Sequence, residues 1–252
     1  MSDIFLGWDV GAWNCDRNPN SRDALCALQG GASRPVLVGN PWHGNLRDLL
    51  VNLEGCELID ALLEQVGLAR DVTRHVTIAI DTPLGWPKRM VELVTAGTTV
   101  AVPSNADENP YLFRTQELAL FDRNLRPLSS VRDMVGSQST KGIHFLRRAQ
   151  LAAVGTGVWS AGTTTAIETY PAAAVAGSDD DGVKLLTAEL HKTCVQRQKR
   201  PPSANWDKDV RDAITCAIVA MLHRREPERL EAPGPGADAA EGWIWLPKGR
   251  NV

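Results

Sequence analysis

The chain lacks most of the features that mark secreted or membrane proteins. Its five cysteines are an odd number, widely scattered, with no spacing typical of a zinc site or a disulfide framework. No stretch approaches the roughly 18 consecutive apolar residues that a membrane-spanning helix needs. The first residues, MSDIFLGWDVG, lack the basic region and apolar run of a signal peptide. We therefore expect a soluble protein of the reducing cytoplasm with no membrane partner.

An excess of positive charge, which many nucleic-acid-binding proteins have, is also absent. The 27 basic residues against 30 acidic ones leave a formal charge of −3, a weak argument against a nucleic-acid partner. The hydrophobic content of 43% in 252 residues is enough for one sizeable core without disulfides or a structural metal. The composition therefore predicts a single domain over residues 1–252.

The N-terminal third has the pattern of strands followed by a helix. A short apolar run over Ile4–Val10 predicts a buried strand, and two further runs, Ala24–Gln29 and Pro35–Gly39, predict a hairpin paired with it. Leucines at three- and four-residue spacings predict a helix over Asn45–Leu68 with a weak point at Gly55. The β-branched run in HVTIAID, residues 75–81, then predicts a strand parallel to the first, because a helix connects them.

The remainder reads as an insertion followed by the last strand and helices. Between about 84 and 160 the pattern is mostly helical and loop-like, with several prolines as breakers. A strand follows in TTTAIETY, then helices over about 183–199 and 206–224, and the tryptophans of WIWLP predict a docked end. These elements predict an α/β fold with a mixed five-stranded sheet, three antiparallel strands plus two parallel ones, flanked by helices.

Acidic residues stand at the ends of three predicted strands and near the start of the last helix. They are Asp9, Asp81, Glu168, Asp209 and Asp212. Because parallel strands deliver their carboxyl ends to one edge of a sheet, we expect these acids to converge there. Clustered carboxylates repel each other unless a cation neutralises them. Oxygen ligands without histidine or thiolate favour Mg²⁺ or Mn²⁺, and two such ions can activate water against a phosphodiester. We therefore predict a catalytic metal site at these acids.

Each acid also has a plain structural interpretation. Asp9 and Asp81 precede turns, where aspartate is common, and Glu168 could be a solvated strand end. Asp207, Asp209 and Asp212 lie in the first turns of a helix, where acids meet the helix dipole favourably. We favour Asp212 as the catalytic one, because the segment after it, 213–222, is strongly apolar and an acid on its flank needs a reason.

Three basic residues are candidates for binding substrate. Arg114 in YLFRTQE could orient a phosphate or an acid of the cluster, and the alternative is a structural ion pair with Glu117. Arg197 and Lys199 belong to the basic stretch HKTCVQRQKR, which could follow a nucleic-acid backbone or form a solvated helix end. The five histidines show no metal-ligand spacing, and we assign none of them a role.

The phrases GWDVG, IAIDTPLGWP, FRTQE, IETYPAA, DVRDA and EGWIWLP resemble a widespread family of predicted RNase H-like nucleases, domain of unknown function 429. The resemblance spans nearly the whole chain. It implies an RNase H-like fold and acids at the positions of Asp9, Asp81, Glu168 and Asp209 with Asp212. The departure is in the last helix, where the family often has two adjacent acids and this chain has Asp207, Lys208, Asp209. The resemblance implies a divalent-metal-dependent nuclease, with nucleic acid of unspecified type as its substrate.

Two other functions compete with this one. A phosphotransferase of the actin, Hsp70 and sugar-kinase type shares the strand, aspartate and glycine at the start, and GTGVWSAGTTT offers a glycine-rich stretch that could approach phosphates. Its ATP site requires a second lobe, for which 252 residues leave little room. The other rival is a non-catalytic RNase H-like domain that binds a partner and keeps its acids for structural reasons.

Overall fold

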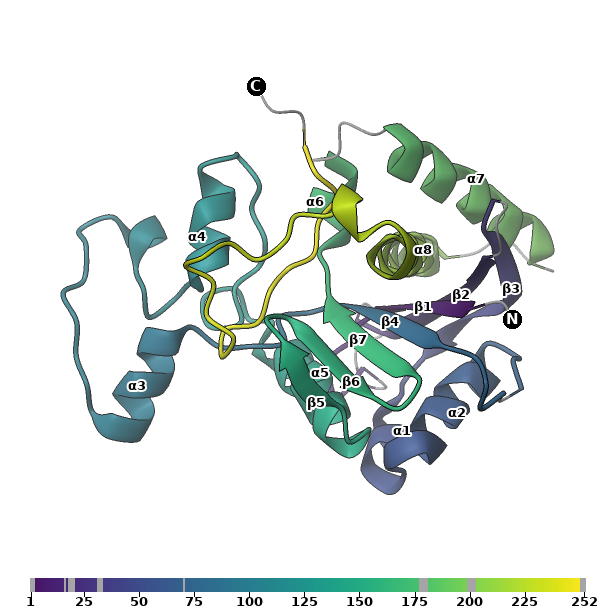
Figure 1. Cartoon of the computed structure of the whole chain (residues 1–252), viewed down its shortest axis with the longest axis horizontal. Helices are drawn as coiled ribbons and strands as arrows, with labels where there is room; N and C mark the ends of the chain where they lie inside the picture. Colours follow the sequence, from purple (N-terminus) through teal and green to yellow (C-terminus); the bar gives the residue numbers. More distant parts are fainter. Residues whose placement is uncertain are drawn as a thin grey trace.

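Seven strands form one mixed β-sheet in the computed structural model (Figure 1). They are β1 (Asp3–Asp9), β2 (Asp23–Gly30), β3 (Val36–Gly44), β4 (Val76–Asp81), β5 (Ala152–Gly155), β6 (Val158–Ala161) and β7 (Thr164–Glu168). Their order across the sheet is β3-β2-β1-β4-β7-β6-β5. The structure describes residues 3–15, 17, 21–30, 34–69, 71–176, 181–198 and 203–249. The predicted α/β class with a mixed sheet is confirmed.

The structure contains the predicted pairings among β3, β2, β1, β4 and β7, the first five strands across the sheet. Strands β3, β2 and β1 pair antiparallel, and β4 runs parallel to both β1 and β7. The prediction of five strands in total was wrong, because β5 and β6 extend the sheet with antiparallel pairs beyond β7. Both lie in the segment that was interpreted as the end of a mainly helical insertion. All four residues of β5 are exposed, so this strand lacks the apolar alternation that would reveal it.

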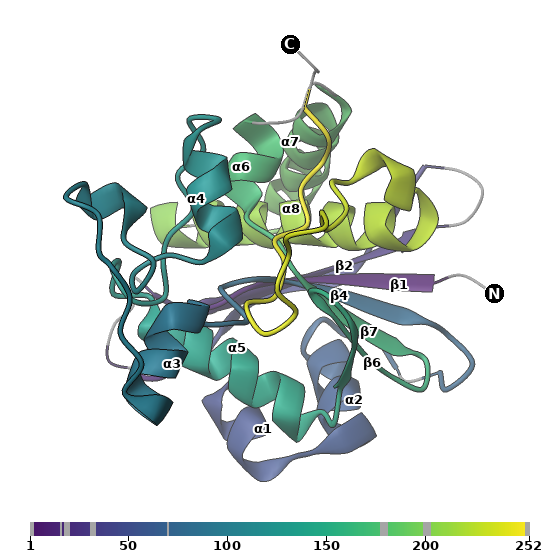
Figure 2. The same ribbon diagram turned by 60° about the vertical axis from the view of Figure 1, so that its left-hand side comes forward.

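Helices cover both faces of the sheet (Figure 2). One face carries α1 (Arg47–Asn52), α2 (Gly55–Gln65) and α5 (Gly136–Arg148), and the other carries α6 (Pro171–Ala176), α7 (Asp181–Arg197) and α8 (Ala204–Arg225). The helix predicted over 45–68 is two helices, because Leu53 and Glu54 are extended and Gly55 has a φ of +55°. The predictions for α7 and α8 are confirmed, and the short helix α6 was missed.

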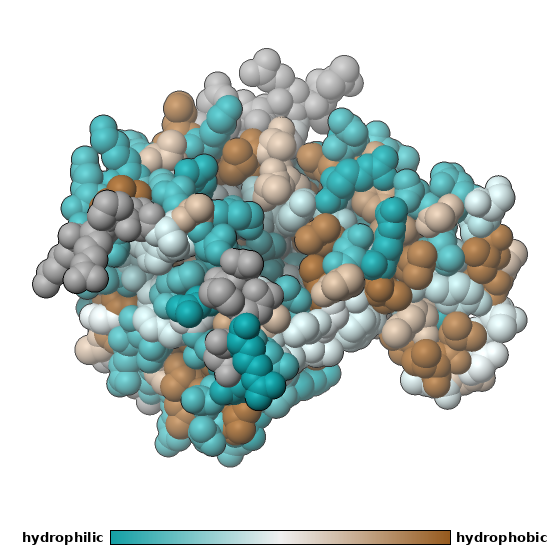
Figure 3. Space-filling view, turned by 180° about the vertical axis from the view of Figure 1, so that it is seen from behind, coloured by the Kyte–Doolittle hydropathy of each residue, from teal (hydrophilic) through white to brown (hydrophobic). Residues whose placement is uncertain are grey.

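A lobe projects beyond the carboxyl ends of the parallel strands. It contains α3 (Lys88–Ala96), α4 (Thr115–Phe121) and the short 3₁₀ helix Ala106–Glu108, and a second 3₁₀ helix, Pro227–Arg229, follows α8. No residue of α3 is buried, and its Val94 is 66% exposed. Figure 3 shows apolar surface, in brown, on this lobe. Within the described residues, no helix is long and apolar enough to cross a membrane.

The sheet separates two hydrophobic cores. Leu6 and Trp8 of β1 pack on the side of α1, α2 and α5, whereas Phe5 packs on the side of α8. Because side chains alternate between the two faces of a strand, Gly7 and Asp9 face α8 as Phe5 does. The long helix α8 begins at the cap of Ser203, whose hydroxyl accepts a hydrogen bond from the Trp206 N–H.

Gly7 is the point at which α8 lies directly on the sheet. A Cβ atom at this position would lie 1.8 Å from the carbonyl oxygen of Ala213 and 2.5 Å from the backbone nitrogen of Ala217. Real side chains do not approach backbone atoms this closely, so only glycine permits this distance between β1 and α8. Because Asp9 lies two residues beyond Gly7 on the same face, the close approach also brings the start of α8 to the end of β1.

We predict that Gly7→Ala destabilises the protein by about 3 kcal/mol, because α8 has to move away from the sheet. Gly155→Ala is the matched control, since a Cβ at this strand residue would meet nothing within 4 Å, and its effect should stay within about 0.5 kcal/mol. Urea unfolding of both variants measures the difference. A Gly7→Ala protein as stable as wild type would contradict the proposed role of the contact.

Candidate carboxylate site

Asp9 and Asp81 end two neighbouring parallel strands at the same level. They are register partners in the β1–β4 pair, and adjacent strands lie about 4.8 Å apart. Ala79 of β4 packs in the α8-side core, so Asp81, two residues later, projects toward the same face as Asp9. Both carboxylates are half-buried, and no hydrogen bond or ion pair to another described residue is found for either of them. The predicted convergence of these two acids is therefore present in the register of the sheet.

Helix α8 adds two acids to the same place. Asp209 and Asp212 line one cavity together with Asp9 and Asp81. Asp207 lies outside this group and contacts His191 of α7 and Arg211 of its own helix, at 3.2 Å and 3.0 Å. The structure thus separates the three acids of α8, of which Asp209 and Asp212 face the cavity and Asp207 faces α7.

The cavity has a volume of about 470 Å³. The acids form one part of its wall, at the ends of β1 and β4 and the first turns of α8. Residues of the segment predicted as an insertion form another part, and they include Pro127, Leu128, Val135 and Gln138. The site therefore lies between the sheet edge and this segment.

Burial and, after it, crowding of negative charge change the acidity of the cluster. Burial is the largest cause that raises the pKa of Asp9 well above its ordinary value, followed by repulsion from Asp81 and Asp212. Burial and then repulsion from Asp212 raise the pKa of Asp81 to about 8. Burial also raises the pKa of Asp212, although the neighbouring Lys208 opposes the change. These raised pKa values mean that the clustered acids bind a proton, or another cation in its place, more readily than isolated aspartates do.

Two residues that the sequence did not single out contact these acids. The Lys208 ammonium lies 3.1 Å from Asp212 and lines the cavity. Burial lowers its pKa, but attraction to Asp212 and then to Asp9 outweighs burial, so the pKa is raised. His43 of β3 places Nε2 at 2.9 Å from Asp209 Oδ2, so this carboxylate is held by an imidazole. The sequence signal for Lys208 was its position between two acids in DKD.

Glu168 has a different environment from the aspartates. Its carboxylate accepts hydrogen bonds from Arg114 Nη1 at 2.8 Å and Nη2 at 2.5 Å, and from the backbone N–H of Leu84 at 2.8 Å. Both oxygens are therefore occupied, and the side chain is 3% exposed. Metal binding by Glu168 stays a prediction, and the metal ligands that we propose are aspartates alone.

The register of β7 explains the different orientation of Glu168. Glu168 pairs with Ile80 rather than with Asp81, and Ile80 packs in the core on the α5 side of the sheet. One residue of offset turns a strand side chain to the opposite face. Glu168 consequently leaves the sheet on the side opposite to Asp9 and Asp81, although it still lines the cavity.

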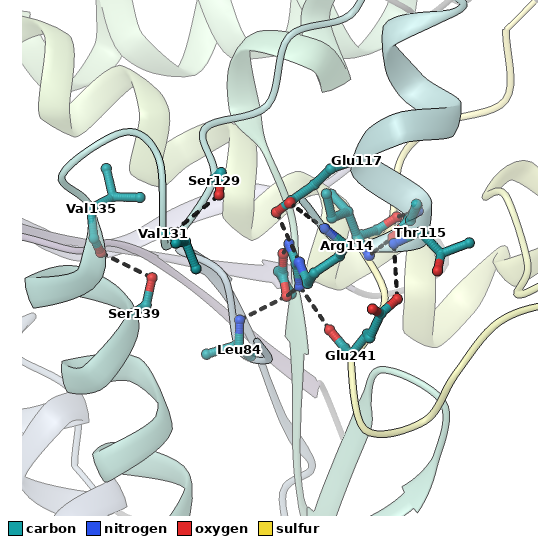
Figure 4. Close-up of polar contacts among 12 residues, drawn as sticks. Leu84, Arg114, Thr115, Glu117, Ser129, Val131, Val135, Ser139 and Glu241 are labelled. Carbon is teal, nitrogen blue, oxygen red and sulfur yellow. Dashed lines mark hydrogen bonds and ion pairs between the residues drawn. The ribbon is translucent and has the colours of Figure 1, made fainter. Parts of the chain in front are cut away.

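Arg114 is the centre of a buried ion-pair network. Figure 4 shows its guanidinium between Glu117 of α4 and Glu241 of the C-terminal segment. Arg114 Nε donates to Glu117 at 2.8 Å, and Nη1 donates to the carbonyl of Glu241 at 2.9 Å as well as to Glu168. With 2% exposure, Arg114 matches the structural alternative to the predicted substrate-binding role. It ties β7, α4 and the C-terminal segment together.

The other two predicted substrate-binding residues lie elsewhere. Arg197 is exposed near the end of α7, donates to the carbonyl of Gly39 at 3.0 Å, and is absent from the described lining of the cavity. Lys199 lies outside the described residues. Their predicted contact with nucleic acid remains a prediction.

A second buried ion pair shapes the loop that follows β1. Lys141 of α5 donates to Asp23 at 2.5 Å, and both side chains are fully buried. The other oxygen of Asp23 accepts from the indole of Trp8 and the backbone N–H of Gly11, at 3.1 Å and 2.9 Å. The turn after Asp9 is therefore held by a fully paired acid, which sequence reasoning did not identify because Asp23 has no neighbouring motif.

The donor chemistry of the cluster fits a hard divalent cation. Asp9, Asp81 and Asp212 offer oxygen ligands, and neither thiolate nor free imidazole competes with them. Among the described residues, no three such acidic, histidine or cysteine side chains are already arranged to hold a metal ion. A cation would have to draw the carboxylates together, and their concentrated negative charge favours binding of that cation.

Comparisons of this chain with protein-family models, with curated proteins and with solved structures found no match. Function therefore has to be inferred from the residues and their geometry.

We predict that Asp81→Asn changes the pH dependence of stability in chelator-treated protein. The ordinary aspartate pKa is 3.8 and that of folded Asp81 is about 8, so between these values the folded state binds more protons than the unfolded state. Wild-type stability should therefore fall as pH rises through this window. Asparagine does not titrate, so the melting temperature of the variant minus that of wild type should increase from pH 4 to pH 8 and then level off.

Thermal scans across this pH range measure the difference. Asp48→Asn on α1 is the matched control, because the Asp48 side chain is 82% exposed and lies outside the acidic cluster. A pH-independent difference for Asp81→Asn would contradict the raised pKa that burial and the neighbouring charge of Asp212 give to Asp81.

Proposed function

We propose that the protein is a divalent-metal-dependent nuclease that hydrolyses nucleic-acid phosphodiesters on an RNase H-like fold. The observation that carries the proposal is the pair Asp9 and Asp81, held in register on adjacent parallel strands and completed by Asp212 from α8. Elsewhere the buried acids Asp23 and Glu168 are paired with a lysine and an arginine. Asp9 and Asp81 have no such partner among the described residues. Leaving two half-buried acids unpaired costs stability, which is typical of a functional site.

The order of the strands supports the fold assignment. Three antiparallel strands followed by two parallel ones, β3-β2-β1-β4-β7, form the arrangement that the sequence resemblance implies. The acids at the ends of β1 and β4 and near the start of α8 occupy the positions that the same resemblance implies. Fold similarity by itself does not establish an activity, so the carboxylate geometry carries the functional argument.

Asp9, Asp81 and Asp212 would hold Mg²⁺ or Mn²⁺. When bound, such an ion lowers the pKa of water and neutralises charge on a phosphate. The chain contributes the orientation of the ligands, since β1 and β4 fix two of the acids and α8 fixes the third. His43 holds Asp209 at the edge of the group, and Lys208 provides a cation next to Asp212 that can attract a phosphate oxygen.

We predict that purified protein with Mn²⁺ cleaves DNA, RNA or a hybrid of the two, and that Asp81→Asn lowers the rate about 10³-fold or more. Asp48→Asn provides a control that removes a carboxylate of equal size from an exposed site and should retain full activity. Gel analysis of labelled linear and structured substrates measures the rates. Saturable binding of ATP at micromolar concentration, with no cleavage of any substrate, would instead support the phosphotransferase alternative.

A further inference from the structure

We propose that the cavity at the acidic cluster binds one nucleotide unit, rather than the middle of a duplex. This inference rests on the proposed function, because it names the part of the substrate that the same site takes. The unit is a nucleoside monophosphate. Its phosphate would lie beside the acids and Lys208, and its base would lie against the apolar part of the lining. It comes either from the end of a single strand or from a free nucleotide.

The size of the cavity fits a small ligand. Its volume of about 470 Å³ lies in the range of about 300–1,000 Å³ that pockets for small molecules and cofactors have. Specific complexes with double-stranded DNA bury about 1,000–2,500 Å² of protein surface. A duplex also keeps its bases inside, where a pocket cannot reach them.

The lining of the cavity combines acids with apolar surface. Besides the acids, it includes Pro127, Leu128 and Val135 from the segment between β4 and β5. Tyr170, at the start of α6, and Ile244 of the C-terminal segment also line the cavity. A flat base packs well against apolar and aromatic side chains, whereas a phosphate belongs near the acids and their cation.

Two polar side chains of the lining have buried atoms without a hydrogen-bond partner. Thr82 is 4% exposed, and its Oγ1 has no partner among the described residues. Oε1 of Gln138 on α5 is in the same situation, and both residues line the cavity. Buried polar atoms without partners cost free energy. A sugar hydroxyl or a base edge offers the hydrogen bonds that these two groups lack.

The number of positive charges also fits one nucleotide. The basic residues among the described lining are Arg22, Arg114 and Lys208, and Arg114 is fully committed to carboxylates and a carbonyl. Arg22 is exposed at the cavity and makes no ion pair with another described residue. Lys208 pairs with Asp212, but its side chain is 75% exposed. Arg22 and Lys208 together can therefore meet one or two phosphates, whereas duplex-binding proteins often contact about 6–10.

The first test fills the cavity without altering an acid. Leu128 is 49% exposed, so Leu128→Trp should fold normally, and Leu185→Trp on α7 is the matched control at 65% exposure outside the described lining. Calorimetric titration with AMP and with dAMP in the presence of Mn²⁺ should show saturable binding to wild type. We expect Leu128→Trp to weaken it at least tenfold, and Leu185→Trp to leave it unchanged.

A second variant keeps the test valid if Leu128→Trp does not fold. Thr82→Val retains the shape of the side chain and removes the hydroxyl without a partner. It should leave the melting temperature of the ligand-free protein equal or higher, yet weaken AMP binding about 2- to 10-fold, as the loss of one hydrogen bond does. Absence of AMP and dAMP binding to wild type, or equal binding by all three variants, would overturn the proposal.

The second test separates the two sources of the nucleotide. Linear and circular single-stranded DNA of the same sequence are incubated with the protein and Mn²⁺. Release of mononucleotides from the linear form alone supports binding of a strand end. AMP binding without cleavage of either form, or of RNA or a DNA–RNA hybrid, supports a free nucleotide and shows that the nuclease proposal fails while this one stands. Equal cleavage of the circular form, without competition by AMP, overturns this proposal and leaves the nuclease proposal intact.

Discussion

The contact between α8 and β1 at Gly7 is the constraint on which the rest of the site depends. Because a single Cβ atom at this point would collide with the backbone of Ala213, the helix lies directly on the sheet only with glycine there. The contact brings an acid-bearing helix turn beside a strand end. Asp212 then adds its charge to that of Asp9 and Asp81, and burial together with this repulsion raises their pKa values. The site thus follows from a packing detail of the core.

The buried acids fall into two groups with different physical roles. Asp23 and Glu168 each have a buried cation and backbone donors as partners, and they hold the turn after β1 and the C-terminal segment in place. Removing one member of such a pair leaves an unpaired charge in the interior, which is why these pairs act as fixed points. Asp9 and Asp81 have no such partner among the described residues. This contrast between satisfied and unsatisfied acids separates the framework from the proposed metal site.

Much of the fold follows from the sequence, and the failures have physical reasons. The parallel pairing of β1 with β4 could be predicted because a β-branched run follows a helix, and this pairing alone puts Asp9 beside Asp81. The orientation of Glu168 could not be predicted. It depends on the pairing of Glu168 with Ile80 instead of Asp81, a one-residue offset that no local sequence pattern encodes. Strand β5 was missed because its residues are all exposed. The role of Lys208 could not be predicted either, because its contact with Asp212 depends on which face of α8 meets the sheet.

The proposed metal site requires that Asp9 is a ligand for a divalent cation rather than a turn-forming or ion-paired acid. Thermal scans of wild type and Asp9→Asn, each with chelator and with Mn²⁺, test this claim most directly, because asparagine keeps the shape of the side chain and removes its charge. We expect the variant without metal to melt at the same temperature as wild type or higher, since repulsion is relieved. We also expect the variant to lose most of the stabilisation by Mn²⁺. A variant destabilised by about 1 kcal/mol with an unchanged response to Mn²⁺ would show that Asp9 is a structural acid and not a ligand.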